Sequence, residues 1–137
     1  MGGPGFIRNI PFEELDNFYL CEFFFDGLKY TSSEACYQAQ KFIEPEYKRL
    51  ISKETNLHEM WKMGQDTKHI TFSNWEDQKV EYMYKACYAK FSQNVLLKEL
   101  LITFSGEKII FTQGSLFWRE NNAKILQRIA LELDGIN

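Results

Sequence analysis

One carboxylate, that of Glu34, stands among aromatic and polar side chains. Tyr30 precedes it and Tyr37 follows it, and Gln38 and Lys41 come about one and two turns later if the segment is helical. A carboxylate placed at the mouth of a pocket could stabilise a developing positive charge or take a proton from water. The pattern therefore makes Glu34 the first candidate for a catalytic residue.

A structural role for the same residues remains open. Thr31 and Glu34 have the spacing of a capping box, in which the acidic side chain only closes the first turn of a helix. Gln38 and Lys41 would then belong to a solvated helix face. The sequence alone does not separate this alternative from the catalytic one.

Two tryptophans are the second feature that could do chemistry. Trp75 and Trp118 could each form a platform for a flat base, since stacking on an aromatic ring stabilises a base by about 1–3 kcal/mol. Both also have structural alternatives. Trp75 follows Asn74, a good helix N-cap, and its role could be limited to a hydrophobic contact at the start of a helix. Trp118 could be a buried residue of the core.

Short elements must position these side chains. Aromatic residues on both sides of Asp26-Gly27 predict a tight β-hairpin over residues 22–30, and residues 108–112 are typical of a strand. Apolar spacing and helix start and stop signals predict helices over residues 33–43, from Pro45, over residues 56–63 up to Gly64, from Asn74 to about residue 91, from Asn94 to Ser105-Gly106, and from about residue 122.

The composition predicts the class of fold. The chain has 137 residues, of which 45% are hydrophobic and 26% charged, which is typical of one globular domain. We expect residues 1–137 to form a single α+β domain that is mainly helical, with a short β-hairpin and a minor sheet. Residues 1–5 are interpreted as a tag remnant or a disordered end. No apolar run approaches the roughly 20 residues of a membrane span, so we expect no membrane contact.

Charge and cysteine usage exclude further classes. Nineteen acidic residues outnumber sixteen basic ones, and a net charge of −3 argues against a general polyanion binder. The three cysteines are scattered, which predicts reduced thiols and a cytoplasmic location. No Cys/His pair has the spacing of metal ligands, so no metal site is expected. The oligomeric state is not predicted.

The order of the segments resembles the NADAR family, named for its association with NAD and ADP-ribose chemistry. Asp16-Asn17-Phe18 is similar to the family's opening S-N-F element. Residues 30–42, the most specific match, resemble its Y-P-S/T-S-E-H-x-Y/F-Q-A-x-K-F motif. Residues 62–65 resemble its R-M-G-R motif, and Asn74-Trp75 with residues 85–91 resemble its N-W pair and its K-A-x-x-A-K-F helix end.

The resemblance implies an N-glycosidase. Bacterial members include an N-glycosidase of early riboflavin-pathway intermediates, and other members remove ADP-ribose from guanine in DNA. The implied reaction is hydrolysis of a ribosyl C–N bond, on a small ribosylated base or on ADP-ribosylated nucleic acid, with neither metal nor organic cofactor. We expect the catalytic residues to be Glu34, Trp75 and Glu120. The expected ligand-binding residues are Asn17, Phe18, Tyr30, Tyr37, Gln38, Lys41, Lys62, Met63, Gly64, Lys90 and Trp118, with the three lysines holding phosphate.

The sequence departs from the family's pattern at several positions. Ala35 replaces a histidine, and Lys62 and Gln65 replace the two arginines of R-M-G-R. The glycine-rich loop that closes over the ligand in the family is reduced to residues 118–122, without a glycine. Glu120 either replaces the acid of that loop or the loop has lost its role.

Two other functions stay open. The altered loop could leave a pocket that binds ADP-ribose or a nucleotide without hydrolysis. Alternatively, the chain is an interaction domain whose aromatic residues all lie in the core. A Glu34 that only caps its helix, with no cleft beside Trp75, would indicate the second of these.

Overall fold

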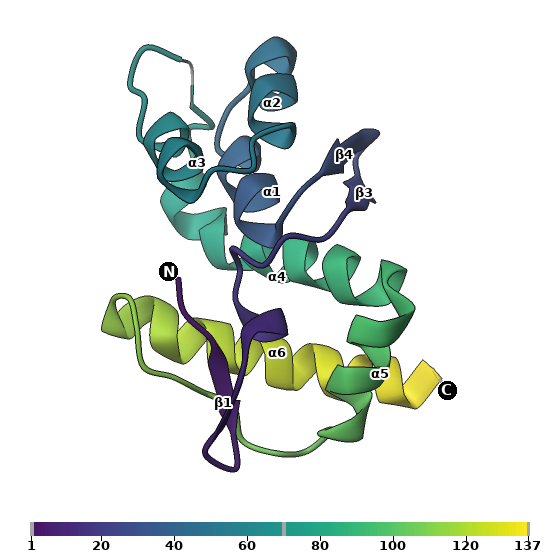
Figure 1. Ribbon diagram of the computed structural model, residues 1–137. Coiled ribbons are helices and arrows are strands. Elements are labelled where there is room, and N and C mark those ends of the chain that lie inside the picture. Colours follow the sequence, from purple (N-terminus) through teal and green to yellow (C-terminus); the bar gives the residue numbers. More distant parts are fainter. Residues whose placement is uncertain (1, 70, 137) are drawn as a thin grey trace.

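Helix α4 (Trp75–Gln93) crosses the middle of the molecule and separates two halves (Figure 1). The computed structural model describes residues 2–69 and 71–136. The other elements, in chain order, are β1 (Gly5–Ile7), β2 (Ile10–Phe12), the 3-10 helix η1 (Glu13–Leu15), β3 (Phe23–Phe25), β4 (Leu28–Tyr30), α1 (Ser33–Gln40), α2 (Pro45–Ser52), α3 (Leu57–Gly64), α5 (Val95–Thr103), β5 (Ile110–Phe111) and α6 (Leu116–Ile136).

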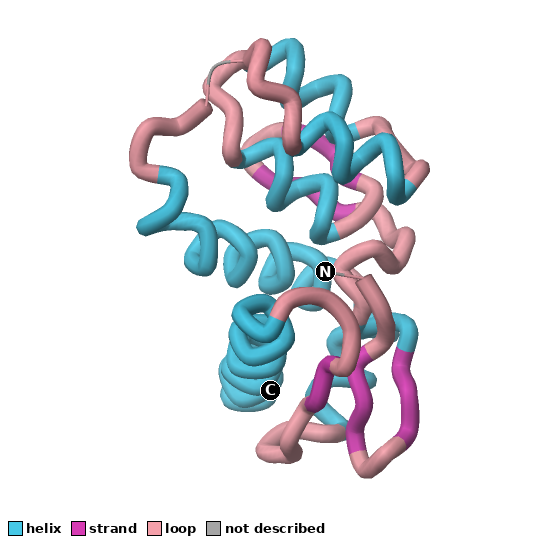
Figure 2. Tube along the Cα trace, turned by 90° about the vertical axis from the view of Figure 1, so that its left-hand side faces the viewer, coloured by secondary structure: helices cyan, strands magenta, loops and turns pink. Residues whose placement is uncertain are grey.

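Each half has its own core, and α4 contributes to both. Helices α1, α2 and α3 and the β3–β4 hairpin lie on one side of α4, around a cluster that includes Phe23, Phe42, Ile51 and Met60. Helices α5 and α6 and a three-stranded sheet lie on the other side, around a second cluster. Figure 2 shows the same division from a second direction. The predicted class, a mainly helical α+β fold with little sheet, is confirmed.

The strand pairings follow from two tight turns. Asp26 and Gly27 both have positive φ angles, as the Asp-Gly prediction required, and β3 pairs antiparallel with β4. Arg8 and Asn9 also have positive φ angles and join β1 to β2 in the same way. The minor sheet has the order β2-β1-β5, and its first two strands were not predicted.

Several predicted boundaries are corrected by the structure. Helix α1 ends at Gln40 rather than at residue 43, because Phe42 leaves the helix to form an isolated bridge with Thr71. Helix α6 begins at Leu116, six residues before the predicted start. Residues 118–122 are therefore helical and do not form a loop. Near the other terminus Gly5 lies in β1, and the backbone N–H of Gly3 donates a hydrogen bond to Asp16.

Candidate functional site

Glu34 lies in the first turn of α1, but it does not cap that helix. The hydroxyl of Ser32 accepts a hydrogen bond from the backbone N–H of Ala35 at 3.0 Å, so Ser32 is the N-cap and the predicted cap was one residue too early. The Oε2 atom of Glu34 accepts a hydrogen bond from Nε2 of Gln38. Its Oε1 atom is buried and has no hydrogen-bond partner in the described chain. The capping-box alternative is therefore wrong.

The surroundings of Glu34 favour its protonated form. The side chain is completely buried, and burial raises the pKa of Glu34 to about 7, against the lowering effects of the Gln38 hydrogen bond and of Lys41. A carboxyl group with such a pKa is present in both protonation states near neutrality. Groups with strongly shifted pKa values are concentrated at functional sites, although structural networks also produce them.

Helix α3 approaches α1 closely beside Glu34. A Cβ atom on Gly64 would lie 2.0 Å from Oε1 of Gln38, which no real structure tolerates. Lys41 donates a hydrogen bond of 2.8 Å from Nζ to the carbonyl of the same glycine. A side chain at residue 64 would therefore have to displace the amide that holds Glu34.

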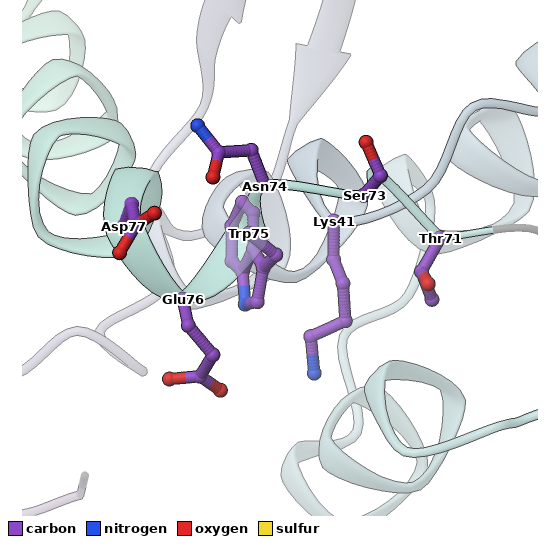
Figure 3. Close-up of a pocket in the computed structure, with 7 residues that line it drawn as sticks. All are labelled: Lys41, Thr71, Ser73, Asn74, Trp75, Glu76 and Asp77. Carbon is purple, nitrogen blue, oxygen red and sulfur yellow. The ribbon is translucent and has the colours of Figure 1, made fainter.

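A hollow of about 390 Å³ opens beside this pair of helices. It is lined by Lys41, Thr71, Ser73, Asn74, Trp75, Glu76 and Asp77. Figure 3 shows the side chains of Lys41, Trp75 and Glu76 extending to the same side of the backbone. Glu34 is not among the lining residues, but its charge acts on Lys41, whose pKa is lowered by burial and raised by Glu34. The carboxylate thus lies behind the wall of the hollow.

Three aromatic rings connect this wall to α6. The ring of Tyr37 lies 5.2 Å from that of Trp75, in a tilted arrangement, and 5.3 Å from that of Trp118, edge to face. Trp118 reaches Tyr37 because residues 116–120 are helical. The two tryptophans therefore flank one tyrosine and belong to a packed cluster rather than to two free platforms. Trp75 is the member that also lines the hollow.

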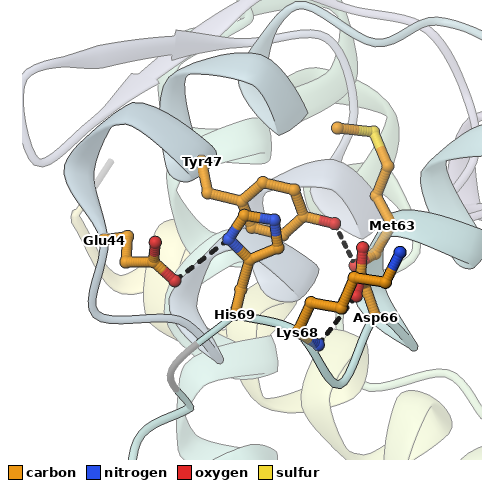
Figure 4. A network of polar contacts seen from close by, with 6 residues as sticks. All are labelled: Glu44, Tyr47, Met63, Asp66, Lys68 and His69. Atoms are coloured by element: carbon orange, nitrogen blue, oxygen red, sulfur yellow. Dashed lines mark hydrogen bonds and ion pairs between the residues drawn. The ribbon is translucent and has the colours of Figure 1, made fainter.

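A polar network holds the segment that carries the rim of the hollow (Figure 4). His69 stacks on Tyr47 of α2 with ring centroids 3.6 Å apart, and its Nδ1 atom lies 3.0 Å from Oε1 of Glu44. The hydroxyl of Tyr47 donates to the carbonyl of Met63 at 2.7 Å. Through these contacts α2 fixes both the end of α3 and the segment after it. No periodic pattern predicts this network, because its partners come from three separate segments.

Asn17 connects the helices behind the site. Its Oδ1 atom accepts hydrogen bonds from Ser33 at 2.9 Å and from the thiol of Cys87 at 3.3 Å. Its backbone carbonyl accepts from the N–H of Glu34 at 2.9 Å, and its amide donates to Asn122 at 3.3 Å. Asn17 therefore positions the first turn of α1 from within the core. Asn122, four residues after Trp118 on α6, was not among the predicted site residues.

The structure does not bring all predicted residues to this place. Lys90 is completely buried, and its Nζ atom donates to the carbonyls of Glu14 and Asp16 at 2.7 and 2.9 Å. Those bonds give the ammonium group an internal structural role and leave it away from the hollow, contrary to the expected phosphate contact. Tyr30 is also buried, where its hydroxyl accepts a hydrogen bond from Gln40.

The remaining predicted residues lie at the periphery. Glu120 is exposed and lines a separate hollow with Lys108 and Phe111, so it does not supply a second carboxylate beside Glu34. Lys62 is exposed on α3. Phe18 and Met63 are half-buried and pack against the core of the first half.

No group of three or more His, Cys, Asp or Glu side chains among the described residues could hold a metal ion. None of the helices in the described part of the chain is both long and apolar enough to span a bilayer.

The fold and these motifs have counterparts in known proteins. The family model for the NADAR domain matches residues 6–124, and the chain belongs to the NADAR family. It is 33% identical over 94 residues to the N-glycosidase YbiA of Escherichia coli strain K12, a match that covers 68% of this chain and 59% of that protein. It is 30% identical over 105 residues to the riboflavin biosynthesis protein VVA0006 of Vibrio vulnificus strain YJ016, covering 76% of this chain and 29% of that protein.

A solved structure supports the same relationship. The NMR structure of the Escherichia coli protein YbiA superimposes with a TM-score of 0.74 at 28% identity, covering 90% of this chain and 77% of that chain. The alignment with the curated YbiA sequence spans only about three fifths of that relative's length. The resemblance to the NADAR family and the fold that it implies are confirmed.

Proposed function

We propose that the protein is an N-glycosidase that hydrolyses the bond between C1 of a ribose and a nitrogen of a base. One observation carries the proposal: a fully buried carboxylate, Glu34, has a raised pKa and an oxygen with no partner in the described chain, and its charge acts on Lys41, which lines a hollow together with Trp75. A buried, half-satisfied carboxylate destabilises a fold, so its presence needs a functional reason. The N-glycosidases among the relatives support the same reaction.

The proposed mechanism uses Glu34 at the sugar. As the C1–N bond breaks, positive charge develops on the ribose, and a nearby carboxylate stabilises it. A water molecule then adds to C1 and gives up one proton, which the carboxylate accepts. The leaving nitrogen keeps the bonding electron pair and takes up one proton from water in the hollow. The hydroxide that remains is neutralised by the proton held on Glu34, which restores the carboxylate, so that one water is consumed per bond broken.

Access to Glu34 is a requirement of this mechanism. Because the side chain is fully buried, substrate binding has to open a path from the hollow to its Oε1 atom. Gln38 holds the other oxygen and keeps the carboxylate oriented while this happens. Trp75 provides the wall for the leaving base, in a cluster with Tyr37 and Trp118.

The charges around the hollow favour a small substrate. Lys41 is its cation, whereas Glu76 and Asp77 carry negative charge on the same rim. A single phosphate can reach Lys41, but a polyanion would meet both carboxylates and a protein of net charge −3. We therefore favour a ribosylamino-pyrimidine phosphate of the riboflavin pathway over ADP-ribosylated guanine in DNA.

The test is hydrolysis of both substrates, with product analysis by mass spectrometry. We expect release of the base from the ribosylamino-pyrimidine phosphate and a loss of about 100-fold or more in kcat for Glu34→Gln, which keeps the shape and the Gln38 hydrogen bond. Glu59→Gln, an exposed carboxylate on α3, is the matched control and should retain wild-type activity. If neither substrate is cleaved, or if Glu34→Gln is as fast as wild type, the assignment fails.

A second function has one observation in its favour. Because Glu120 lies away from Glu34, the site lacks the second carboxylate that sugar hydrolysis often employs. The alternative is a module that binds ADP-ribose or a nucleotide without turnover. Calorimetry that shows ADP-ribose binding, with no product from either substrate, would support it against the N-glycosidase.

A further inference from the structure

A second hollow lies on the other side of the chain segment that leads into α4. Phe72 faces it, whereas Trp75, three residues later, lines the first hollow. It consists of two adjoining parts of about 560 and 310 Å³ that share Asp26, Gln40, Ile43 and Lys48. The β3–β4 turn, the end of α1 and the start of α2 surround it. Neither part includes a residue that lines the first hollow.

Gln40 presents a fixed hydrogen-bond acceptor there. Its side chain is only 7% exposed, and its Nε2 atom donates to the hydroxyl of Tyr30 at 3.2 Å and to the carbonyl of Cys36 at 3.1 Å. These two acceptors decide which end of the amide carries the nitrogen. The Oε1 atom receives no hydrogen bond from the described residues, and Gln40 lines both parts of the hollow. A ligand with an N–H group could donate a hydrogen bond to this Oε1 atom.

Aromatic rings form the wall beside this acceptor. Phe72 and Tyr82 meet edge to face with centroids 6.2 Å apart, and both line the larger part together with Phe42. Phe72 is 36% exposed, so part of its ring is open to a ligand in the hollow. Tyr82 is held in place by stacking on Trp75 at 5.7 Å. The wall is therefore rigid, apolar and suited to a flat ring.

The charges at the opening favour an anion. Lys48 lines both parts and Arg49 lines the smaller one, and neither side chain forms an ion pair or a hydrogen bond with a described residue. Asp26 is the opposing carboxylate, at the β3–β4 turn. Two cations against one carboxylate leave a net positive rim on a protein whose net charge is −3.

From this arrangement we propose that the second hollow binds a nucleotide whose base carries an amino group. The base packs on Phe72, its amino group donates to Oε1 of Gln40, and its phosphate lies at Lys48. This site is separate from the proposed catalytic site and does not depend on the N-glycosidase assignment.

Calorimetric titration with AMP tests the proposal. We expect saturable binding that Phe72→Ala weakens by at least about fivefold and that Lys48→Ala also weakens. Lys53→Ala, an exposed lysine at the end of the same helix, is the matched control and should not change the affinity. All three residues are at least partly exposed, so the variants should fold. Absence of AMP binding, or binding that is equal in Lys48→Ala, Phe72→Ala and wild type, overturns the proposal.

Two further comparisons locate the ligand. Purine riboside 5′-monophosphate lacks the amino group and should bind roughly three- to tenfold more weakly than AMP, without any change to Gln40. Lys41 does not line the second hollow, so Lys41→Ala should leave AMP binding unchanged. If Lys41→Ala abolishes binding while Lys48→Ala does not, the nucleotide occupies the first hollow and the second site does not exist.

Discussion

The Nε2 atom of Gln38 donates a hydrogen bond of 2.7 Å to Oε2 of Glu34, one turn earlier on α1. It is the contact that orients a carboxylate whose other oxygen has no partner in the described chain. The amide of Gln38 packs closely against Gly64 without a hydrogen bond to it in the described chain, so the orientation of Glu34 depends on the distance between α1 and α3. The proposed chemistry therefore has consequences for stability as well as for rate.

Stability should fall as pH rises through neutrality. The folded protein holds the Glu34 proton more tightly than the unfolded chain, because the pKa is about 7 when folded and 4.5 in the ordinary state. The stabilising contribution is complete below about pH 4.5 and is lost as pH rises to about 7, a change of about 3 kcal/mol. Urea unfolding of wild type and Glu34→Gln from pH 4 to 8 measures this loss: the two proteins should have similar stability near pH 4, and wild type should become less stable than the variant as pH rises to about 7. If the free energies of unfolding of the two proteins changed with pH in the same way, the raised pKa of Glu34 would be contradicted.

The pH dependence of the rate should have the opposite sign. If the ionised form of Glu34 stabilises the ribosyl cation, kcat increases with pH up to about 7 and is constant above it. Stopped assays on the cleaved substrate between pH 5 and 9 give the profile. A rate that decreases through pH 7 would instead make the protonated carboxyl the acid that serves the leaving base.

Replacing Gly64 should disturb Glu34 through Gln38. A Cβ at residue 64 overlaps the Gln38 amide, so Gly64→Ala should lower the free energy of unfolding by about 1–3 kcal/mol and reduce activity. Adding Gln38→Ala removes the overlap and should recover about 1 kcal/mol or more of stability, but not activity. Gly135→Ala is the control, because no atom lies within 4 Å of the new Cβ there. Additive effects of the two substitutions would show that Gly64 and Gln38 are not in contact.

Lys90 should prove structural rather than ligand-binding. Lys90→Met removes two charge-assisted hydrogen bonds and leaves the carbonyls of Glu14 and Asp16 without that partner, which should cost about 3–5 kcal/mol. Lys124→Met, at an exposed position on α6, should change stability by less than about 0.5 kcal/mol. Thermal unfolding of the two variants gives the comparison. A Lys90→Met protein with unchanged stability but a raised KM would restore the phosphate role.

Local patterns predicted the first half of the fold well. Asp26-Gly27 identified the hairpin, Pro45 began α2, and Asn56 caps α3 through a hydrogen bond to the N–H of Glu59. The Arg8-Asn9 turn was not predicted, because Arg8 is not a residue that favours a positive φ angle, no glycine follows Asn9, and the strands on both sides have only three residues each. The start of α6 was not predicted, although the hydroxyl of Ser115 accepts a hydrogen bond from the backbone N–H of Trp118 at 3.3 Å there. Leu116 and Phe117 are exposed, so the helical spacing of buried apolar residues begins later than the helix itself.

The candidate site was predictable only in part. The neighbourhood of Glu34, Gln38 and Lys41 follows from the helical spacing of α1 and its C-cap, whereas the meeting of Trp75 with Lys41 at one hollow depends on how α4 packs. The burial of Lys90 could not be foreseen, because its carbonyl partners lie more than 70 residues away along the chain. The expected place of Glu120 beside Glu34 was wrong for a different reason. Because residues 118–122 are helical, the side chains of Glu120 and Trp118 extend from opposite sides of α6.

Because α4 contributes buried side chains to both clusters, the chain cannot be divided into two autonomous pieces. A fragment that stops before Trp75 would expose the apolar faces of α1 and β3, and a fragment that begins after Gln93 would expose those of α5 and α6. Split between residues 65 and 68, the protein should regain its shape only when both parts are mixed. If the two fragments do reassemble, fusing them to two other proteins would report whether those proteins come close to each other.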